Sequence, residues 1–379
     1  MLYREFGKTE LQCSILGFGA MRLPVLNNDE SQIDEEHAIR MIRYAIDHGV
    51  NYVDTAYPYH RGMSEILVGK ALKDGYREKV FLATKSPVWQ VEKHEDFYKF
   101  LDEQLEKLQT DHIDMYLMHA LSEGRWEKIK NLRFYDFVER AKAQGKIRFI
   151  GFSFHDKYPV FKRIIDEYDG WDFCQIQLNY MDVDYQAGLR GLKYAASKGL
   201  PVVIMEPLKG GKLARLPKKA RKILDETGKN WSDVEWALRW LANFPEVNVI
   251  LSGMSSFEQV KENIEIAQRL HPNNLTEEQL KVIEQVRKTL ESYAVINCTE
   301  CGYCMPCPNG VDIPGNFRVY NETIMFEDFE GGRGTYAWFE SRKVSASFCT
   351  ECGECLAKCP QKLDIPRLMK KIHAELAKA

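Results

Sequence analysis

The sequence predicts an α/β protein, a (β/α)8 barrel followed by a smaller, mainly helical domain rich in cysteine. Up to about residue 270, short β-branched runs alternate with amphipathic stretches, an alternation typical of a parallel sheet. Eight such units fit the roughly 250 residues that an eight-stranded barrel needs. Eight of the ten cysteines then lie after residue 297. We therefore predict a barrel over residues 1–290 and a cysteine-rich domain over residues 291–379.

The barrel elements follow one another in a regular order. Residues 3–7 and 11–19 flank the turn KTE and predict a small hairpin that leads into the first barrel strand. The predicted buried strands are 14–20, 50–56, 80–86, 113–120, 147–153, 173–180, 200–207 and 247–254. Helices are predicted between them, for example over 35–49, 95–109 and 189–199, and several end at a glycine, a common helix stop. A polar helix over 276–294 precedes the cysteines.

A doubly wound open sheet is the alternative for the first domain. That fold usually has a glycine-rich phosphate loop after its first strand. The segment GFGAMRLP, residues 17–24, has two glycines but no third at the required spacing. We therefore favour the barrel.

Composition limits the classes of function. The net charge of −3 argues against nucleic-acid binding as the main role. No apolar run reaches the length that spans a membrane, and the charged start MLYREFGKTE has no signal-peptide core. We expect a cytoplasmic protein with no membrane and no nucleic-acid partner. In that compartment, dense C-x-x-C spacing indicates metal rather than disulfides.

Three consecutive predicted strands end in ionisable residues, and the active sites of barrels lie at strand ends. These residues are Asp54, Lys85 and His119, and Tyr59 follows Asp54 in the loop AYPYH. The set suits carbonyl reduction: Tyr59 would donate a proton, Lys85 would lower the pKa of the phenol, and Asp54 would hold the lysine. His119 would orient the carbonyl and help to move the proton. The alternative is a structural ion pair beside a core histidine.

These segments resemble those of the aldo-keto reductases. The motifs DTAYPY, ATKS and DMYLMHA are similar to the segments that carry the catalytic tetrad of that family, in order and spacing, and the resemblance covers residues 1–270. It implies a small carbonyl substrate and a nicotinamide cofactor, usually NADPH, that lies extended over the strand ends without a Rossmann fold. The spacing of the family selects Tyr59 over Tyr57 as the catalytic phenol.

The resemblance also implies a set of cofactor contacts. The residues that match are Ser153, Gln175, Met205, Pro207, Leu208, Gly253, Gln259 and Asn263. Ser153 and Gln175 would bind the carboxamide, and Met205 would lie beside the nicotinamide ring. Gln259 and Asn263 belong to the segment on the adenine side.

The sequence departs from the family pattern at several positions. Phe154 stands where asparagine is usual, and Met205 stands where an aromatic residue commonly stacks on the nicotinamide. The lysine often found near Gly253 for the 2′-phosphate is absent, so NADPH and NADH both stay open. His60 replaces a usual glycine, which would alter the substrate pocket. Trp89 would line that pocket or pack on the surface.

The second domain carries two cysteine runs. The first, CTECGYCMPCP, holds Cys298, Cys301, Cys304 and Cys307, and the second, CTECGECLAKCP, holds Cys349, Cys352, Cys355 and Cys359. Thiolates suit iron or zinc, but closely spaced cysteines with a trailing proline, occurring twice, match two [4Fe–4S] clusters better than two zinc sites. In that pattern the fourth cysteine of each run ligates the other cluster. One cluster would thus take Cys359, and the other would take Cys307.

Cross-ligation explains why the first run is one residue shorter before its last cysteine, because Cys307 need not close onto its own cluster. The whole chain resembles the ferredoxin-bearing aldo-keto reductases of bacteria and archaea. The long segment between the runs, residues 308–348, predicts helices broken at 331–334 and implies a ferredoxin-like domain of the helical type.

Three functional hypotheses remain open. In the first, the clusters exchange single electrons with a ferredoxin or another carrier while the barrel handles the carbonyl. A flavin usually mediates between hydride and single electrons, and although no flavin motif is recognisable, barrel loops can bind FMN without one. In the second, the clusters only stabilise the small domain of an ordinary NAD(P)H-dependent reductase. In the third, the barrel is a non-enzymatic nucleotide-sensing or partner-binding module.

Overall fold

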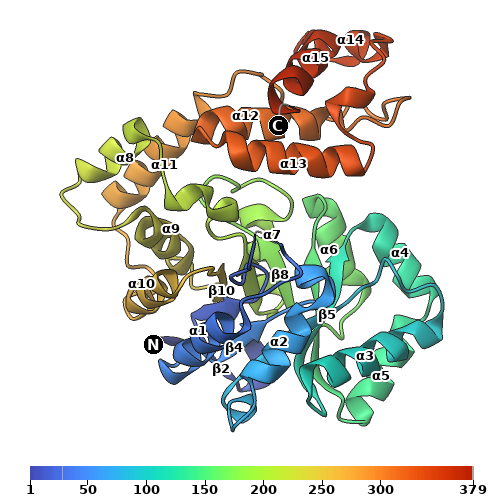
Figure 1. The fold of residues 1–379 in the computed structure, drawn as a ribbon, viewed down its shortest axis with the longest axis vertical. Helices are drawn as coiled ribbons and strands as arrows, with labels where there is room; N and C mark the ends of the chain where they lie inside the picture. The colour runs from blue at the N-terminus through green and yellow to red at the C-terminus, as the bar shows by residue number, and fades with distance from the viewer. Residues whose placement is uncertain (28, 378–379) are drawn as a thin grey trace. The chain divides into compact units, whose positions relative to one another are not determined.

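The computed structural model describes residues 1–27 and 29–377 of the chain. These residues form two compact units (Figure 1). Unit 1 comprises Met1–Leu213 and Val234–Glu277, and unit 2 comprises Ala214–Asp233 and the chain from Glu278 onward. The domain boundary at residue 290 stays a prediction, and the polar helix that precedes it groups with the cysteine-rich part.

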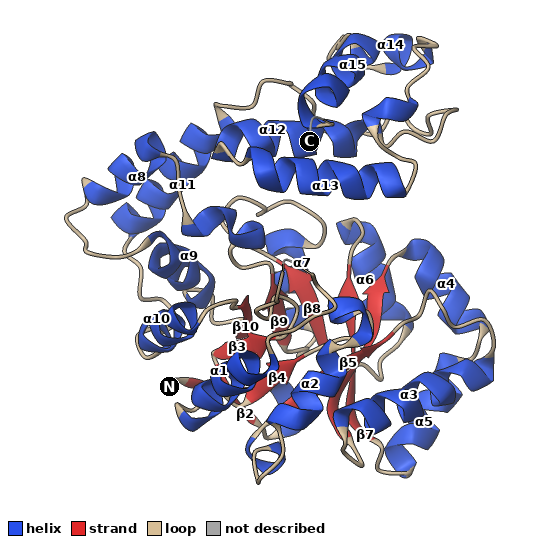
Figure 2. Cartoon of the chain, in the orientation of Figure 1, coloured by secondary structure: helices blue, strands red, loops and turns tan. Residues whose placement is uncertain are grey.

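Unit 1 is a closed barrel of eight parallel strands in the order β10-β3-β4-β5-β6-β7-β8-β9, as predicted. Figure 2 shows these strands in red among the helices in blue. The barrel strands are β3 (Leu16–Gly19), β4 (Tyr52–Asp54), β5 (Phe81–Ser86), β6 (Ile113–Leu121), β7 (Ile147–Phe154), β8 (Phe173–Gln177), β9 (Val202–Met205) and β10 (Val247–Gly253). The predicted hairpin consists of β1 (Tyr3–Glu5) and β2 (Gln12–Ser14), which pair antiparallel.

The hairpin contributes to the core of the barrel. Phe6 and Cys13 are fully buried in one hydrophobic cluster with Tyr52 and Phe173. Tyr52 and Phe173 are the first residues of β4 and β8, so this cluster lies at the end where those strands begin. The opposite end, where strands finish, is where barrel enzymes build their active sites.

The segments that connect the barrel strands form helices because their apolar residues recur at helical spacing and are buried along one face. In the first helix, Asp34 accepts a hydrogen bond from the backbone of His37 at the N-terminus, while Ala38, Met41 and Ala45 repeat at helical spacing and are buried. The helices of this part of the chain are α1 (Glu35–Asp47), α2 (Ser64–Ala71), α3 (His94–Leu108), α4 (Glu123–Asn131), α5 (Phe134–Ala143), α6 (Tyr158–Glu167), α7 (Gly188–Ser197), α9 (Asp233–Ala242) and α10 (Phe257–Ala267). Short 3-10 turns are η1 (Gly7–Thr9), η2 (Tyr59–Gly62), η3 (Arg77–Lys79) and η4 (Lys209–Ala214).

Unit 2 is helical over the residues described. Its helices are α8 (Lys218–Asp225), α11 (Glu277–Glu291), α12 (Ile313–Phe326), α13 (Phe329–Ser341), α14 (Glu354–Lys358) and α15 (Ile365–Leu376), with a 3-10 turn η5 (Ala346–Phe348). Its core joins Phe317 and Tyr320 of α12 with Tyr336 of α13 and Met369 of α15. The mainly helical character of this domain is as predicted.

The helix break predicted at glycines 331–334 is wrong. Helix α13 runs through them, and the break lies at Glu327, whose φ is 53°. Asp328 then caps α13 by accepting a hydrogen bond from a backbone N–H of its first turn. Gly332 allows α13 to approach α12 closely, since a Cβ at that position would lie 2.0 Å from Thr323 Oγ1. Gly332 therefore serves helix packing, and none of these glycines marks a turn.

Over the residues that the structure describes, no helix combines the length and the apolar character needed to cross a lipid bilayer.

Candidate active site and cluster cavities

Neighbouring strands carry the predicted tetrad to one end of the barrel. Asp54 is the last residue of β4, Lys85 is the next to last of β5, and His119 lies near the end of β6. Tyr59 begins the short η2 helix after β4. Because these strands are adjacent and parallel, their ends lie at the same edge of the sheet.

Lys85 lies at the centre of this group. Its Nζ donates to Asp54 Oδ1 and to the carbonyl oxygen of Thr55, both at 2.7 Å, and lies 3.4 Å from the Tyr59 hydroxyl. The lysine is fully buried, and Asp54 is 3% exposed. The His119 ring meets the Tyr59 ring edge-on, with 6.1 Å between centroids. The structure thus brings all four predicted residues together.

Burial sets the protonation states of the site. It disfavours the ammonium of Lys85, but Asp54 and Tyr59 hold the pKa of the lysine above its ordinary value. Burial also raises the pKa of Tyr59, and Lys85 offsets only part of that rise. The lysine thus lowers the pKa of the phenol, as expected, but burial outweighs it, so the net shift is upward. Burial, together with the charge of Lys85, lowers the pKa of His119 well below its ordinary value, so this imidazole is neutral near pH 7.

A buried polar network holds the strand segment that carries Lys85. Gln104 Nε2 donates to the carbonyl oxygen of Lys85 at 3.1 Å and to Glu65 Oε1 at 2.6 Å. The Thr84 hydroxyl donates to the same carboxylate oxygen at 2.6 Å, and the Tyr116 hydroxyl donates to Gln104 Oε1 at 2.9 Å. Sequence reasoning missed this network, because its members come from α2, α3, β5 and β6 and share no motif.

Two buried side chains near the strand ends fit a carboxamide. Ser153 and Gln175 lie opposite each other on β7 and β8 and are almost fully buried. Gln175 Oε1 finds no hydrogen-bond donor in the described part of the chain. Ser153 Oγ accepts from the Ala120 amide at 2.7 Å, which leaves its hydroxyl proton for another acceptor. A carboxamide offers the matching N–H donor and carbonyl acceptor, so these residues fit a nicotinamide.

The phenylalanine that replaces the family asparagine serves the core. Phe154 is fully buried and packs edge-on against Phe161 of α6, with 5.1 Å between ring centroids. Met205, the other departure, is the last residue of β9 and is half-buried opposite Gln177 of β8. A methionine at this position can make a polarisable contact with a flat ring.

The predicted adenine-side residues already bond within the chain. Gln259 Oε1 accepts from the Ser255 amide at 2.8 Å, and Asn263 Nδ2 donates to Ser252 Oγ at 2.9 Å. These bonds join α10 to the end of β10, where Gly253 is the last residue. The two amides therefore shape the turn between strand and helix.

A charged pair at the same strand ends was not predicted. Arg22 follows β3 and lies beside Gly253, where an added Cβ would be 3.5 Å from the arginine side chain. Its guanidinium is 3.9 Å from the carboxylate of Glu206. Glu206 directly precedes Pro207 and Leu208 in the predicted cofactor segment. The partners are far apart along the chain, so no spacing could indicate the pair.

Trp89 lies beside the tetrad, as the pocket interpretation of this residue expects. Its ring centroid is 5.1 Å from that of His119, and the Arg125 guanidinium lies 5.4 Å from the Trp89 ring. Arg125 Nη1 also donates to the carbonyl oxygen of Ala120 at 2.7 Å. An aromatic and cationic wall therefore stands next to His119.

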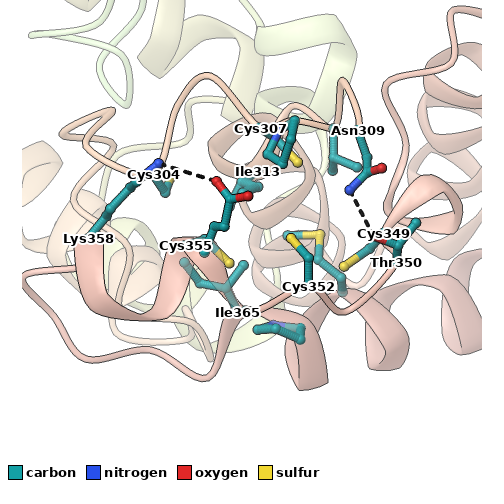
Figure 3. A pocket seen from close by; sticks show the side chains of 16 residues that line it. Cys304, Cys307, Asn309, Ile313, Cys349, Thr350, Cys352, Cys355, Lys358 and Ile365 are labelled. Carbon is teal, nitrogen blue, oxygen red and sulfur yellow. Dashed lines mark hydrogen bonds and ion pairs between the residues drawn. The ribbon is translucent and has the colours of Figure 1, made fainter.

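Unit 2 arranges its cysteines around two spaces, which we call cavity A and cavity B. Cysteines 298, 301, 304 and 359 line cavity A. Cysteines 307, 349, 352 and 355 line cavity B, where Cys304 also reaches the wall (Figure 3). Each cavity therefore draws on both runs, in the division that cross-ligation predicts.

The walls of these cavities fit a cluster. Apolar side chains complete them, and Ile365 lines both. The cysteines are free of disulfides. Among the residues described, no three cysteine, histidine or carboxylate side chains converge on a point as ligands of a single ion do. At the rim of cavity B, Asn309 Nδ2 donates to Thr350 Oγ1 at 2.8 Å and ties the two runs together (Figure 3).

The two runs share a backbone conformation at their start. In the repeated CTECG, Glu300 and Gly302 have φ of 52° and 78°, and Glu351 and Gly353 have φ of 57° and 77°. The runs differ afterwards: helix α14 spans most of the gap before the last cysteine of the second run, while the first has a cis peptide bond before Pro306. The shorter run reaches its last cysteine without a helical turn.

Comparison with known proteins gives matches along most of the chain. A family model described as "Aldo/keto reductase family" matches residues 15–288, and one described as "4Fe-4S dicluster domain" matches residues 297–363. An uncharacterized oxidoreductase of Bacillus subtilis is 27% identical over 76% of this chain and 97% of its own length. An NADH-specific methylglyoxal reductase of Escherichia coli is 27% identical over 68% of this chain and 91% of its own length. The holo form of an aldo-keto reductase from Bacillus halodurans superposes with a TM-score of 0.63 at 28% identity, over 76% of this chain and 96% of that one.

Proposed function

Because the chain belongs to the aldo/keto reductase family and is an oxidoreductase, we propose that it reduces the carbonyl group of a small molecule with hydride from a nicotinamide cofactor. The observation that carries this proposal is the buried Lys85, whose Nζ bonds Asp54 and faces the Tyr59 hydroxyl. A charged lysine beside a phenol is what proton delivery to a carbonyl oxygen requires.

Each member of the tetrad has a role in that reaction. Ser153 and Gln175 would hold the carboxamide of a nicotinamide cofactor, which would supply hydride when bound. Tyr59 gives its proton to the carbonyl oxygen as negative charge develops there. Lys85 stabilises the phenolate that remains, and Asp54 keeps the lysine in place and charged. The neutral His119 donates a hydrogen bond that orients the carbonyl.

NADH and NADPH are both candidates for the cofactor. The E. coli relative named as NADH-specific favours NADH. The guanidinium of Arg22 beside Gly253 favours NADPH, since arginine binds phosphate well and only NADPH carries a 2′-phosphate. Initial rates with each cofactor under identical conditions distinguish the two.

We propose that cavities A and B each hold one [4Fe–4S] cluster. The support is the dicluster-domain match over residues 297–363 and the division of the eight cysteines between two cavities. Such clusters exchange single electrons, so the partner would be a ferredoxin or a similar carrier. Exchange between hydride and the clusters would need a flavin or another carrier that handles one and two electrons.

A structural role for the clusters is the second candidate. Six of the eight cysteines pack against the hydrophobic core of unit 2, so clusters there would cross-link a small core. In that case the barrel would reduce its substrate with NAD(P)H alone.

Anaerobic purification with a visible spectrum and identification of bound nucleotide or flavin tests both proposals. Two clusters predict about eight iron and eight sulfide per chain. Clusters whose spectrum changes with NAD(P)H or substrate support electron transfer, whereas unresponsive clusters in an active enzyme support the structural role. Wild-type protein that reduces no aldehyde or ketone with either cofactor would overturn the reductase proposal.

A further inference from the structure

The turn that carries Tyr59 is held by the next residue along the chain. His60 is 7% exposed, and its ring contacts two points of the segment after β3. The Leu23 amide donates to His60 Nε2 at 3.1 Å, and Nδ1 lies 3.0 Å from the carbonyl oxygen of Glu30. We propose that His60 is a positioning residue for the Tyr59 phenol, an inference that rests on the proposed function.

These two contacts define the tautomer of His60. A backbone amide can only donate, so Nε2 must accept, and a carbonyl oxygen can only accept, so Nδ1 must carry the proton. A neutral imidazole with its proton on Nδ1 satisfies both partners. An imidazolium would bring two N–H groups together at Leu23. His60 therefore acts through neutral hydrogen bonds rather than through charge.

The segment that His60 contacts is itself structured. Within residues 20–27 and 29–34, Val25 and Ile33 form an antiparallel bridge, and the Leu26 amide donates to the carbonyl oxygen of Gln32 at 2.8 Å. Leu23 is 3% exposed. His60 therefore attaches the Tyr59 turn to a fixed element, which we call the β3–α1 segment.

The backbone of the turn needs such support. His60 and Arg61 have φ of 50° and 53°, a region that residues other than glycine seldom adopt. The turn runs from the end of β4 to the start of α2, over residues 55–64. It presents the Thr55 carbonyl and the Tyr59 hydroxyl to the Nζ of Lys85. A shift of the turn would therefore change the contact on which proton delivery depends.

A second tie holds the other end of the turn. The Ser64 hydroxyl donates to the Ala20 carbonyl oxygen at 2.9 Å and lies 2.8 Å from Thr55 Oγ1. The hydrogen bonds of His60 and of Ser64 therefore both attach the turn to the β3–α1 segment, which begins at Ala20. His60 is the one next to the phenol, so its loss should affect Tyr59 without unfolding the turn.

The test compares His60→Gly with His60→Asn in the full-length holoprotein. Glycine accepts positive φ and removes both contacts, so it separates the side chain from backbone strain. Asparagine also tolerates this conformation and keeps one polar group near the ring position. In the glycine variant we expect faster hydrogen exchange in the β3–α1 segment and a kcat for carbonyl reduction lower by about 10-fold or more. The KM for the nicotinamide cofactor should not change. The His60→Asn variant should have an exchange rate and a kcat between those of the glycine variant and the wild type.

The outcomes separate this inference from the proposed function. If the glycine variant is active and its hydrogen exchange in the β3–α1 segment equals that of the wild type, His60 does not attach the turn to that segment. If its kcat equals that of the wild type, His60 does not position Tyr59. Wild-type protein that reduces no carbonyl overturns the proposed function and this inference with it. His48→Gly, at an exposed histidine after α1, is the matched control. It should change neither the hydrogen exchange of the β3–α1 segment nor the kcat.

Discussion

At the scale of single residues, Lys85 couples the stability of the barrel to its chemistry. Lys85→Met would leave the buried Asp54 carboxylate without its cation, so we expect the free energy of unfolding to fall by about 3–5 kcal/mol and reduction to be lost. Urea denaturation and initial rates measure the two effects. Lys70→Met is the control, since its pair with Glu35 is exposed and should contribute at most about 1 kcal/mol. Equal losses in the two variants would contradict the buried pair.

The raised pKa of Tyr59 predicts how activity depends on pH. The protonated phenol is the proton donor, so carbonyl reduction should be constant from neutral pH upward and fall only above the ordinary pKa of a tyrosine, near 10. The rate of alcohol oxidation, which needs the phenolate, should rise where the rate of carbonyl reduction falls. Profiles of kcat/KM measure this dependence. Tyr57→Phe, which removes a phenol that bonds Glu103, should leave the profile unchanged, and a decline already near pH 8 would argue against Tyr59 as the donor.

How far the sequence predicts the site differs from residue to residue. The tetrad could be placed because Asp54, Lys85 and His119 each end a recognisable strand, and strand ends share an edge. The pairing of Arg22 with Glu206 could not be predicted from the sequence, because only the closed barrel brings their loops together. The sign of the Tyr59 pKa shift was also beyond sequence reasoning, since burial outweighs the lysine and burial depends on packing.

At the scale of elements, the contact between α12 and α13 depends on one glycine. Gly332→Ala would place a Cβ 2.0 Å from Thr323 Oγ1, so we expect it to destabilise unit 2 by about 1–3 kcal/mol. Gly334→Ala is the matched control: nothing lies within 4 Å of its added Cβ, so it should stabilise the helix by about 0.5–1 kcal/mol. Thermal unfolding followed through the cluster absorbance compares them. Equal stability of both variants would contradict close packing at Gly332.

The elements themselves differ in how well their sequences predict them. The barrel strands are predicted because each is a short apolar run between helical patterns, and this alternation has few solutions. Helix α13 is not, because the glycines at 331, 332 and 334 have low helix propensity and indicate a break. Tertiary contact overrides that preference, since the helix needs a side chain no larger than hydrogen at Gly332.

At the scale of the whole molecule, the division of cysteines between the cavities can be tested by substitution. We expect Cys301→Ser and Cys359→Ser to alter the same cluster, and Cys307→Ser and Cys352→Ser to alter the other. Electron paramagnetic resonance of the reduced proteins, with iron counts, should group the four variants in these pairs. Spectra that instead pair Cys307 with Cys301 would mean that each run closes on its own cluster.

The division of the chain into compact units is the least predictable level. Residues 214–233 lie between two barrel strands in sequence, and α8 has an ordinary amphipathic pattern, yet they group with unit 2. Nothing in their composition distinguishes them from a barrel helix. The start of the cysteine-rich part, by contrast, is evident because cysteine density changes sharply after residue 297.

The crossed arrangement of the two cysteine runs has a consequence for the order of assembly. Filling either cavity brings both runs together, because each cavity takes cysteines from both. The entropy of closing the long loop between the runs is therefore lost once, with the first cluster, and the second forms in a chain already folded back on itself. We expect loading to be cooperative, so a population short of iron would consist mainly of chains with both clusters and chains with none.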